Sequence, residues 1–221
     1  MRRILEPEVM ETSKDALEYD SMDFLEPNTR FALDALALIA DLERPEVLDV
    51  GTGTARIPIL MAQQRANISI LAVDLSPSMI RVSTDNVAAA GVAQQVRLQT
   101  MDAKRLRLPN AHFDLTVCNS TIHHLPEPIV GFREIARVTK PGAAIMVRDL
   151  ARPPSMDAAW AIVKRAAAGE SRHQQQLFFD SLCAALTPEE VTDVVSRAGL
   201  AVLTIRMVSD RHWTAEGRKA K

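Results

Sequence analysis

Short apolar runs alternate with amphipathic stretches from about residue 46 to residue 150. Runs rich in β-branched residues predict strands at 47–50, 68–73, 96–101, 113–118 and 143–147. Apolar positions at helical spacing predict intervening helices at 56–65, 76–90 and 127–139, the last ending before Pro141-Gly142. Because strands alternate with helices, we expect βαβ units and a doubly wound α/β sheet of parallel strands.

The flanking sequence predicts further helices and a closing hairpin. Residues 1–26 are acidic and irregular, and Asn28 is a candidate N-cap for a helix over 29–42. Residues 155–185 carry helical signals alone, and Thr187-Pro188-Glu189-Glu190 begins another helix. Residues 201–208 and 209–214 predict the two strands of an antiparallel hairpin, and residues 217–221 predict a frayed tail.

Composition narrows the class of protein. The 221 residues are 47% hydrophobic and 24% charged, which favours one globular domain over two. The net charge of −2 argues against a large nucleic-acid partner. Cys118 and Cys183 are far apart, which gives neither a disulfide framework nor a metal-ligand spacing, so we expect no metal. Without an apolar leader or a run of roughly 20 apolar residues, we expect a cytoplasmic protein with no membrane span.

Glycines and acids follow three successive predicted strands. Gly51 and Gly53 follow the first strand, where a backbone free of side chains can approach a ligand closely. Asp74 ends the second strand about twenty residues later, the spacing of an acid that accepts ribose hydroxyls. Since Ser76 takes the cap position, we expect Asp74 to face the ligand freely. Asp102, after the third strand, can accept a hydrogen bond from the adenine amino group. Taken singly, the glycines are also compatible with a generic turn, and Asp74 and Asp102 with solvated acids.

The segments 47–54, 73–79, 101–103 and 113–117 resemble the ordered motifs of class I methyltransferases. The resemblance implies S-adenosylmethionine as cofactor and a Rossmann-like sheet of seven strands, the last one antiparallel. It implies that the glycine turn holds the methionine part, Asp74 the ribose and Asp102 the adenine, with Met101 and Leu75 sandwiching the ring. The expected cofactor-binding residues are Asp49, Gly51, Thr52, Gly53, Asp74, Leu75, Met79, Met101, Asp102, Ala103, Asn119 and Ser120.

One domain over 1–221 then has four parts. They are an N-terminal helical lid (1–44), the cofactor-binding core (45–150), a helical insertion after strand five (151–186), and a C-terminal helix with the closing hairpin (187–221). A nicotinamide-dependent oxidoreductase is the competing interpretation of the glycine turn. Arg56 replaces the third glycine of that motif, and Asp49 suits the ammonium group of S-adenosylmethionine, so the methyltransferase is favoured.

The loop Asn119-Ser120-Thr121-Ile122-His123-His124-Leu125-Pro126 resembles that of methyltransferases acting on small molecules, including quinones. It differs from the Asn/Asp-Pro-Pro-aromatic motif for nucleic-acid or glutamine nitrogens. The sequence therefore predicts methyl transfer by in-line displacement to a small-molecule acceptor, with no nucleic acid as partner. A non-catalytic S-adenosylmethionine-binding sensor or partner subunit stays open as an alternative. A protein or RNA methyltransferase stays open too, and so does the oligomeric state, for which a homodimer is one option.

Four residues are candidates for acting on the acceptor. His123 and His124 are candidate bases if the acceptor must lose a proton, and we expect at most one of the two rings to face it. Either histidine could instead only pack the loop. Asp149, just beyond the fifth strand, is a candidate for orienting the substrate, and Tyr19 resembles the tyrosine of N-terminal lids in the family.

Overall fold

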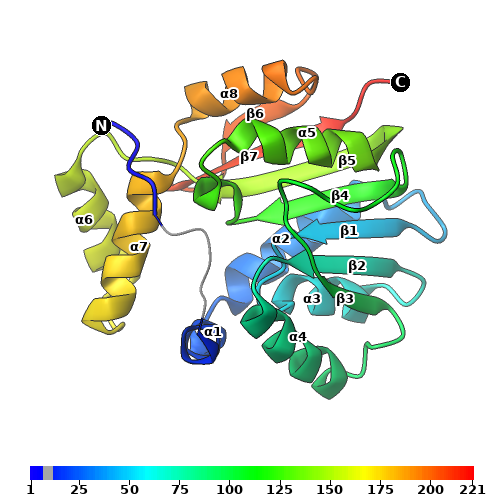
Figure 1. Ribbon diagram of the computed structural model, residues 1–221, viewed down its shortest axis with the longest axis horizontal. Helices are drawn as coiled ribbons and strands as arrows, with labels where there is room; N and C mark the ends of the chain where they lie inside the picture. Colours follow the sequence, from blue (N-terminus) through cyan, green and yellow to red (C-terminus); the bar gives the residue numbers. More distant parts are fainter. Residues whose placement is uncertain (7–11) are drawn as a thin grey trace.

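A seven-stranded sheet forms the centre of the computed structural model, which describes residues 1–6 and 12–221 (Figure 1). The strands are β1 (Glu46–Val50), β2 (Ser69–Asp74), β3 (Val96–Thr100), β4 (Phe113–Asn119), β5 (Thr139–Leu150), β6 (Thr204–Met207) and β7 (His212–Arg218). Their order is β3-β2-β1-β4-β5-β7-β6, with β1 to β5 parallel and β7 antiparallel to both neighbours. The predicted Rossmann-like fold and its antiparallel last strand are confirmed.

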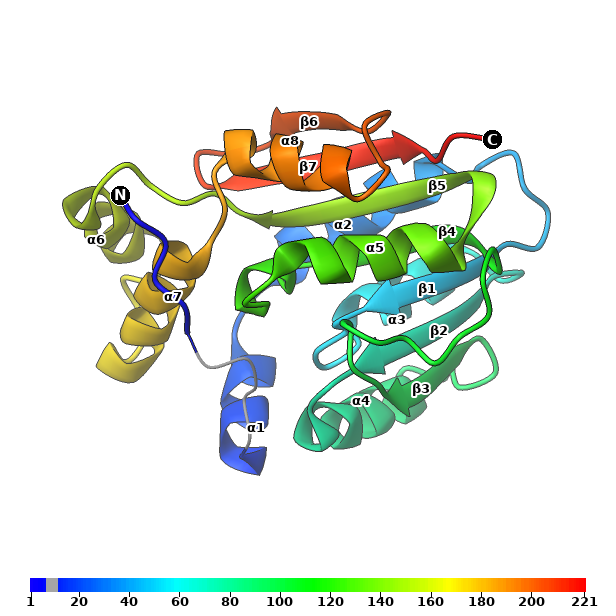
Figure 2. The same cartoon turned by 45° about the horizontal axis from the view of Figure 1, so that its top comes forward.

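Helices cover both faces of the sheet. They are α1 (Ser13–Ser21), α2 (Leu25–Ala37), α3 (Arg56–Gln64), α4 (Pro77–Ala89), α5 (Pro128–Val138), α6 (Met156–Ala166), α7 (Arg172–Ala184) and α8 (Pro188–Arg197), with a 3₁₀ turn η1 (Ile122–His124) after β4. Figure 2 shows α5 and α8 on one face, and α2 and α3 on the other. The helices α6 and α7 pack mainly on each other, beyond the end of β5.

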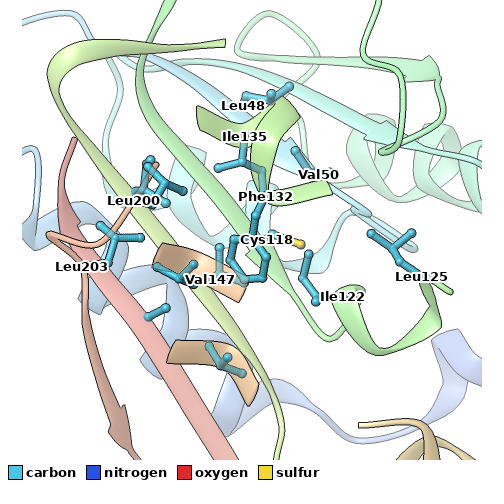
Figure 3. Close-up of a cluster of buried hydrophobic side chains, with 14 of the residues drawn as sticks. Leu48, Val50, Cys118, Ile122, Leu125, Phe132, Ile135, Val147, Leu200 and Leu203 are labelled. Carbon is cyan, nitrogen blue, oxygen red and sulfur yellow. The ribbon is translucent and has the colours of Figure 1, made fainter. Parts of the chain in front are cut away.

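Alternation along the strands divides the apolar interior into two layers. Leu48 of β1 and Val147 of β5 point to the face of α5 and α8, where Phe132 is also buried (Figure 3). Their neighbours Val47 and Met146 point to the opposite face. Because β1, β4 and most of β5 are buried on both faces, their sequences are rich in apolar residues, whereas β3 at the edge of the sheet is largely exposed and polar.

The strand register gathers the carboxyl ends at one edge of the sheet. Val50 of β1 pairs with Val73 of β2 and with Cys118 of β4, and Asp74 pairs with Thr100 of β3. The loops that follow β1, β2, β3 and β4 therefore emerge side by side. This is the edge where open α/β sheets bind ligands.

The N-terminal elements differ from the prediction. Residues 13–21 form α1, capped by Thr12, where the sequence indicated irregular chain. Asn28 does not cap a helix, because α2 begins at Leu25 and ends at Ala37, short of residue 42. Phe24 at its N-cap makes no side-chain cap bond, so burial of Phe31, Ala32 and Ala35 stabilises this helix instead.

Two further boundaries are wrong because β5 pairs with β4 from Thr139 onward and with β7 as far as Arg218. The strand β5 begins at Thr139, directly after α5, so Pro141-Gly142 lies inside a strand instead of ending a helix. Gly217 pairs with Ile145 in this ladder, so the expected frayed tail begins in a strand. The closing hairpin itself is confirmed, as are the helical segment after β5 and the capping box at Thr187. No helix in the described residues has the length and apolar character that crossing a bilayer requires.

Candidate cofactor and acceptor site

The glycine turn after β1 is fixed by the neighbouring strand β2. The backbone N–H groups of Gly51 and Thr52 donate to the carbonyl of Val73, at 2.8 and 2.9 Å. Gly51 has a φ of +73°, and a Cβ built on it would lie 2.1 Å from Thr121 Oγ1. The residue at 51 must therefore be glycine for both conformational and steric reasons.

Asp74 has a second task that the sequence did not indicate. Its Oδ2 accepts from the N–H of Gly53 at 2.8 Å, and its Oδ1 accepts from the N–H of Ser76 at 2.9 Å. Ser76 does cap α4, through the N–H of Met79, but the expectation that Asp74 is thereby left free is wrong. Burial raises the pKa of Asp74 even though these bonds oppose the shift. Each oxygen keeps a lone pair with which it can accept a ligand hydroxyl.

Asp49 is a buried carboxylate with an incomplete set of partners. The residue is 2% exposed, and its Oδ2 has no hydrogen-bond partner among the described residues. Burial raises the pKa of Asp49 to about 7, and the nearby charge of Asp74 acts in the same direction. An ionised carboxylate in such a place requires a cation. The ammonium group of S-adenosylmethionine meets that requirement, so the residues fit the cofactor.

Asp102 lies at the same edge of the sheet and is more exposed. Its Oδ1 accepts from the N–H of Lys104 at 2.8 Å and lies 3.2 Å from Lys104 Nζ. The carboxylate thus shapes its own loop and still borders the cavity next to Met101 and Ala103. Its predicted bond to adenine stays a prediction.

A cavity of about 600 Å³ lies over the glycine turn. Every residue predicted to bind the cofactor lines it: Asp49, Gly51, Thr52, Gly53, Asp74, Leu75, Met79, Met101, Asp102, Ala103, Asn119 and Ser120. These residues come from the ends of β1, β2, β3 and β4 and from the segments that follow them, and the strand register brings these segments together. The three acids therefore face one space and not different surfaces.

Tyr19 covers the glycine turn from α1. Its Cε1 is the heavy atom nearest to a Cβ built on Gly53, at 3.6 Å, and its ring packs near Met79 of α4. Burial, together with the charges of Asp74 and Asp20, raises the pKa of Tyr19 to about 12. The side chain is thus a neutral phenol at physiological pH, and its role as a lid residue stays a prediction.

Arg56, which takes the place of a third glycine, connects this lid to the core. Its Nε lies 2.8 Å from Asp20 Oδ1 and its Nη2 lies 2.7 Å from Asp20 Oδ2. Asn86 of α4 donates to the same carboxylate at 2.9 Å. A bidentate arginine–carboxylate pair fixes orientation as well as distance. The substitution that argued against a nicotinamide site therefore also positions α1.

A second cavity, of about 720 Å³, adjoins the first. Both are lined by Tyr19, Asn119, Ser120 and His124, so they share a wall of side chains. The remaining walls come from α2, from α7 and from the hairpin of β6 and β7. This space lies where an acceptor could reach a bound cofactor, and the helical segment after β5 lines it through Phe178 and Ser181.

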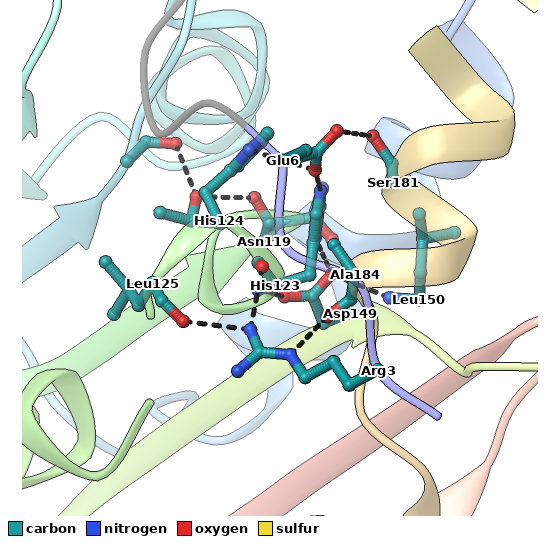
Figure 4. Close-up of polar contacts among 12 residues, drawn as sticks. Arg3, Glu6, Asn119, His123, His124, Leu125, Asp149, Leu150, Ser181 and Ala184 are labelled. Atoms are coloured by element: carbon teal, nitrogen blue, oxygen red, sulfur yellow. Dashed lines mark hydrogen bonds and ion pairs between the residues drawn. The ribbon is translucent and has the colours of Figure 1, made fainter. Parts of the chain in front are cut away.

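His123 and Asp149 form a buried pair at the wall of the second cavity (Figure 4). His123 Nδ1 lies 2.5 Å from Asp149 Oδ1, and the N–H of His123 donates to Asp149 Oδ2 at 2.9 Å. Burial disfavours a charged ring, but the carboxylate of Asp149 raises the pKa of His123 above its ordinary value. Burial would likewise raise the pKa of Asp149, and the charge and hydrogen bond of His123 hold it low. Asp149 belongs to β5 itself and orients His123.

His124 is the more accessible of the two histidines. Its side chain is 25% exposed against 4% for His123. His124 lines both cavities and His123 lines the second. Both residues line the second cavity, and the prediction that at most one ring faces the acceptor stays a prediction.

Sequence reasoning missed Arg3 and Glu6, which reach this site from the N-terminal segment (Figure 4). Arg3 Nη2 donates to the carbonyls of His123 and Leu125, at 2.9 and 2.8 Å, and its Nε donates to the carbonyl of Ala184. Glu6 Oε1 lies 3.1 Å from His124 Nδ1. No local pattern marks either residue, because their partners lie more than a hundred positions away.

Residues 48–147 match the family model described as "Methyltransferase domain". Over these residues the chain is similar to the methyltransferase domains of that family. A ubiquinone biosynthesis O-methyltransferase of Xanthomonas campestris pv. campestris is 29% identical over 123 residues, which are 56% of this chain and 50% of that protein. A ubiquinone/menaquinone biosynthesis C-methyltransferase of Geobacter sulfurreducens is 28% identical over 140 residues, covering 60% and 55%. The chain spans about half the length of the curated relatives it matches.

The methyltransferase fold extends beyond the matched region. A crystal structure of an S-adenosylmethionine-dependent methyltransferase from Aquifex aeolicus superposes with a TM-score of 0.64 at 18% identity. The superposition covers 95% of this chain and 99% of that one. The predicted resemblance to class I methyltransferases is confirmed, and S-adenosylmethionine is the cofactor that this family uses.

Proposed function

We propose that this protein transfers a methyl group from S-adenosylmethionine to a small-molecule acceptor. The observation that carries the proposal is the convergence of Asp49, Asp74 and Asp102 with the glycine turn on one cavity that adjoins a second. Relatives named as an O-methyltransferase of ubiquinone biosynthesis and a C-methyltransferase of ubiquinone/menaquinone biosynthesis support a small acceptor. The glycines and acids thus form the cofactor half of the site, and the second cavity forms the acceptor half.

Three residues of the chain hold the cofactor in this proposal. Asp49 binds its ammonium group, Asp74 its ribose hydroxyls and Asp102 its adenine. When bound, S-adenosylmethionine supplies an electrophilic methyl group on a sulfonium. What the protein adds is position, because correct orientation of two reactants can account for about 7–11 kcal/mol of a barrier.

The walls of the second cavity favour a small acceptor over a nucleic acid. Each arginine that lines it has a carboxylate partner: Arg30 and Arg148 pair with Asp34, Arg206 with Glu216, and Arg211 with Asp210. Arginines that are already paired with carboxylates attract a phosphate backbone only weakly, and such a backbone is bound through the charge of lysine and arginine.

His124, at the junction of the cavities, is the residue that we assign to contact the acceptor. Asp149 positions His123 beside it, and Tyr19 closes the cofactor side.

A cytoplasmic location belongs to the same proposal. Cys118 and Cys183, the only cysteines in the sequence, are both buried free thiols. Thiols persist in reducing compartments.

The proposal is tested by titration calorimetry with S-adenosylmethionine and with NAD, followed by assay of S-adenosylhomocysteine release over a panel of hydroxylated and quinonoid small molecules. Binding of S-adenosylmethionine and turnover with a panel member would support the proposal. Binding without turnover on any acceptor, including bulk RNA and protein, would point to the sensor alternative. Preference for NAD would overturn the assignment.

A further inference from the structure

Glu6, His123 and His124 form a cluster at the wall of the second cavity, from parts of the chain that are far apart in sequence. One ligand atom from each lies within 4.8 Å of the other two. Figure 4 shows the carboxylate of Glu6 beside both imidazole rings, with Ser181 on its other side. We propose that these three side chains bind a divalent metal ion, with Zn²⁺ as the best match.

The distances agree with ligands that share one metal ion. Glu6 Oε1 lies 3.1 Å from His124 Nδ1 and 3.4 Å from His123 Nε2. Two donor atoms about 2.0–2.1 Å from a tetrahedral Zn²⁺ are about 3.3 Å apart. Two imidazoles and one carboxylate are also a ligand set that Zn²⁺ uses where a fourth position stays open. The cluster thus has the dimensions and the chemistry of such a site.

Two of the three ligand atoms make no hydrogen bond within residues 1–6 and 12–221. Glu6 Oε1 and His124 Nδ1 are buried, and neither has a hydrogen-bond partner among the described residues. The two atoms are within reach of each other, yet their alignment does not make a hydrogen bond. Buried polar atoms are almost always satisfied, so a pair left open beside each other requires an explanation. A cation between them satisfies both.

Neighbouring residues already hold the ligands in place. Asp149 Oδ1 contacts His123 Nδ1 at 2.5 Å, which leaves Nε2 to face the cluster. Ser181 Oγ donates to Glu6 Oε2 at 3.0 Å, which leaves Oε1 to face it. Carboxylates that bind the far nitrogen of a histidine ligand are the usual outer shell of metal sites, where they set the tautomer and the ring orientation.

The location indicates what an open coordination position would bind. His123, His124 and Ser181 line the second cavity, so the position would face the acceptor. Resting on the proposed function, we assign it to an oxygen atom of the acceptor. The two rings then hold that oxygen through the ion instead of taking its proton. Binding of the metal itself does not depend on this assignment.

The test is titration calorimetry of the metal-stripped full chain with Zn²⁺, without cofactor or acceptor. We expect one equivalent to bind, and we expect Glu6→Gln and His124→Gln each to weaken binding at least tenfold. The matched control is His173→Gln. His173 belongs to a second group with Asp15 and Glu18 that is partly exposed, and its loss should leave the high-affinity equivalent unchanged.

Two further measurements separate a metal site from a merely structural cluster. Asp149→Asn keeps the shape of the side chain and should weaken Zn²⁺ binding about 10- to 100-fold, as loss of an outer-shell carboxylate does. Co²⁺ substituted at the site should show a visible absorption band that Glu6→Gln alters. Binding of S-adenosylhomocysteine, measured by calorimetry on the same samples, shows whether each variant is folded and whether its cofactor site is intact. This readout does not depend on the binding of the metal.

The proposal fails if the wild-type chain binds no stoichiometric Zn²⁺, or if Glu6→Gln and His124→Gln bind it as the wild type does. Either outcome with normal S-adenosylhomocysteine binding overturns the metal site and leaves the proposed methyl transfer standing. Stoichiometric Zn²⁺ binding without cofactor binding would instead contradict the proposed function.

Discussion

The carboxylate of Asp74 accepts a hydrogen bond from the backbone N–H of Gly53 over 2.8 Å, so the end of β2 holds the turn that follows β1. Val73, the preceding residue, accepts two more bonds from the same turn. The cofactor cavity is therefore preformed in the absence of a ligand, and Asp74 helps to hold its backbone in place. A ligand that meets a preformed site loses less free energy to ordering the protein.

Asp74→Ala should weaken binding of S-adenosylmethionine by at least about 1–3 kcal/mol, because it removes a charged acceptor and frees a donor of the turn. This corresponds to about a 5- to 150-fold rise in Kd, measured by calorimetry. Asp193→Ala is the control, since Asp193 is exposed on α8 and forms an ion pair with Arg197. Unchanged affinity in Asp74→Ala would remove this residue from the site.

Cofactor affinity should fall as the pH is lowered through about 7, the pKa to which burial raises Asp49. Below this pH the carboxyl is neutral and no longer attracts an ammonium group, which costs up to about tenfold in affinity per pH unit. Calorimetry from pH 5.5 to 8.5 measures the slope. Asp49→Asn, similar in shape but without a charge, should bind weakly and with no step near pH 7; a step that persists in this variant would assign it to another group.

Asp49 should also make the stability of the cofactor-free protein depend on pH, but with the opposite sign: affinity for the cofactor rises with pH, whereas stability falls. In the unfolded chain Asp49 ionises near its ordinary pKa of 3.8, whereas the folded protein keeps the proton up to about 7. The native state binds more protons between these values, so the free energy of unfolding decreases as the pH rises. Urea unfolding at pH 5 and pH 7.5 should show a larger decrease for the wild type than for Asp49→Asn. Equal decreases would mean that the carboxyl is already ionised in the folded chain.

Gly51→Ala should destabilise the fold far more than Gly91→Ala, although both glycines have left-handed backbone. Their φ values are +73° and +70°, so each variant carries a conformational cost of roughly 1–2 kcal/mol. A Cβ at position 91 meets nothing within 4 Å, whereas at position 51 it would overlap Thr121. Denaturant unfolding measures the difference, and Thr121→Gly in the Gly51→Ala background should recover part of it. Equal losses would show that the turn and the loop after β4 are not in contact.

Tyr19→Ala should speed the release of cofactor, and Tyr19→Phe should not. The ring covers the turn near Gly53, while the phenol stays neutral up to a pH of about 12. Its apolar face therefore does most of the covering. Stopped-flow dissociation measures the rate, and we expect Tyr19→Ala to raise it at least fivefold. A comparable rise in Tyr19→Phe would instead assign the hydroxyl a hydrogen bond to the ligand.

The alternation of strands and helices along the chain and the cofactor residues could be predicted because their signals are local. A buried parallel strand is a continuous apolar run, and the left-handed backbone of the turn that follows β1 favours glycine at Gly51. The spacing from this turn to Asp74 is set by one βαβ unit. Local signals were therefore sufficient to identify residues that line one cavity, and no distant contact had to be known.

The features that were missed depend on distant contacts. Nothing near Glu6 in the sequence indicates that it lies against His124, or that Arg3 binds the carbonyls of η1. The start of α2 was misplaced because burial, and not a cap, stabilises that helix.

By itself the sequence determined the α/β alternation, the edge of the sheet where a ligand binds and the acids that meet there, since backbone conformation and hydrophobic period act over a few residues. Only the tertiary structure decided that Asp74 braces the turn, that Asp149 holds His123, and that Glu6 completes a cluster with two histidines. Those relationships depend on which side chains the packed chain brings within about 3 Å, and hydrogen bonds and ion pairs act only at that range.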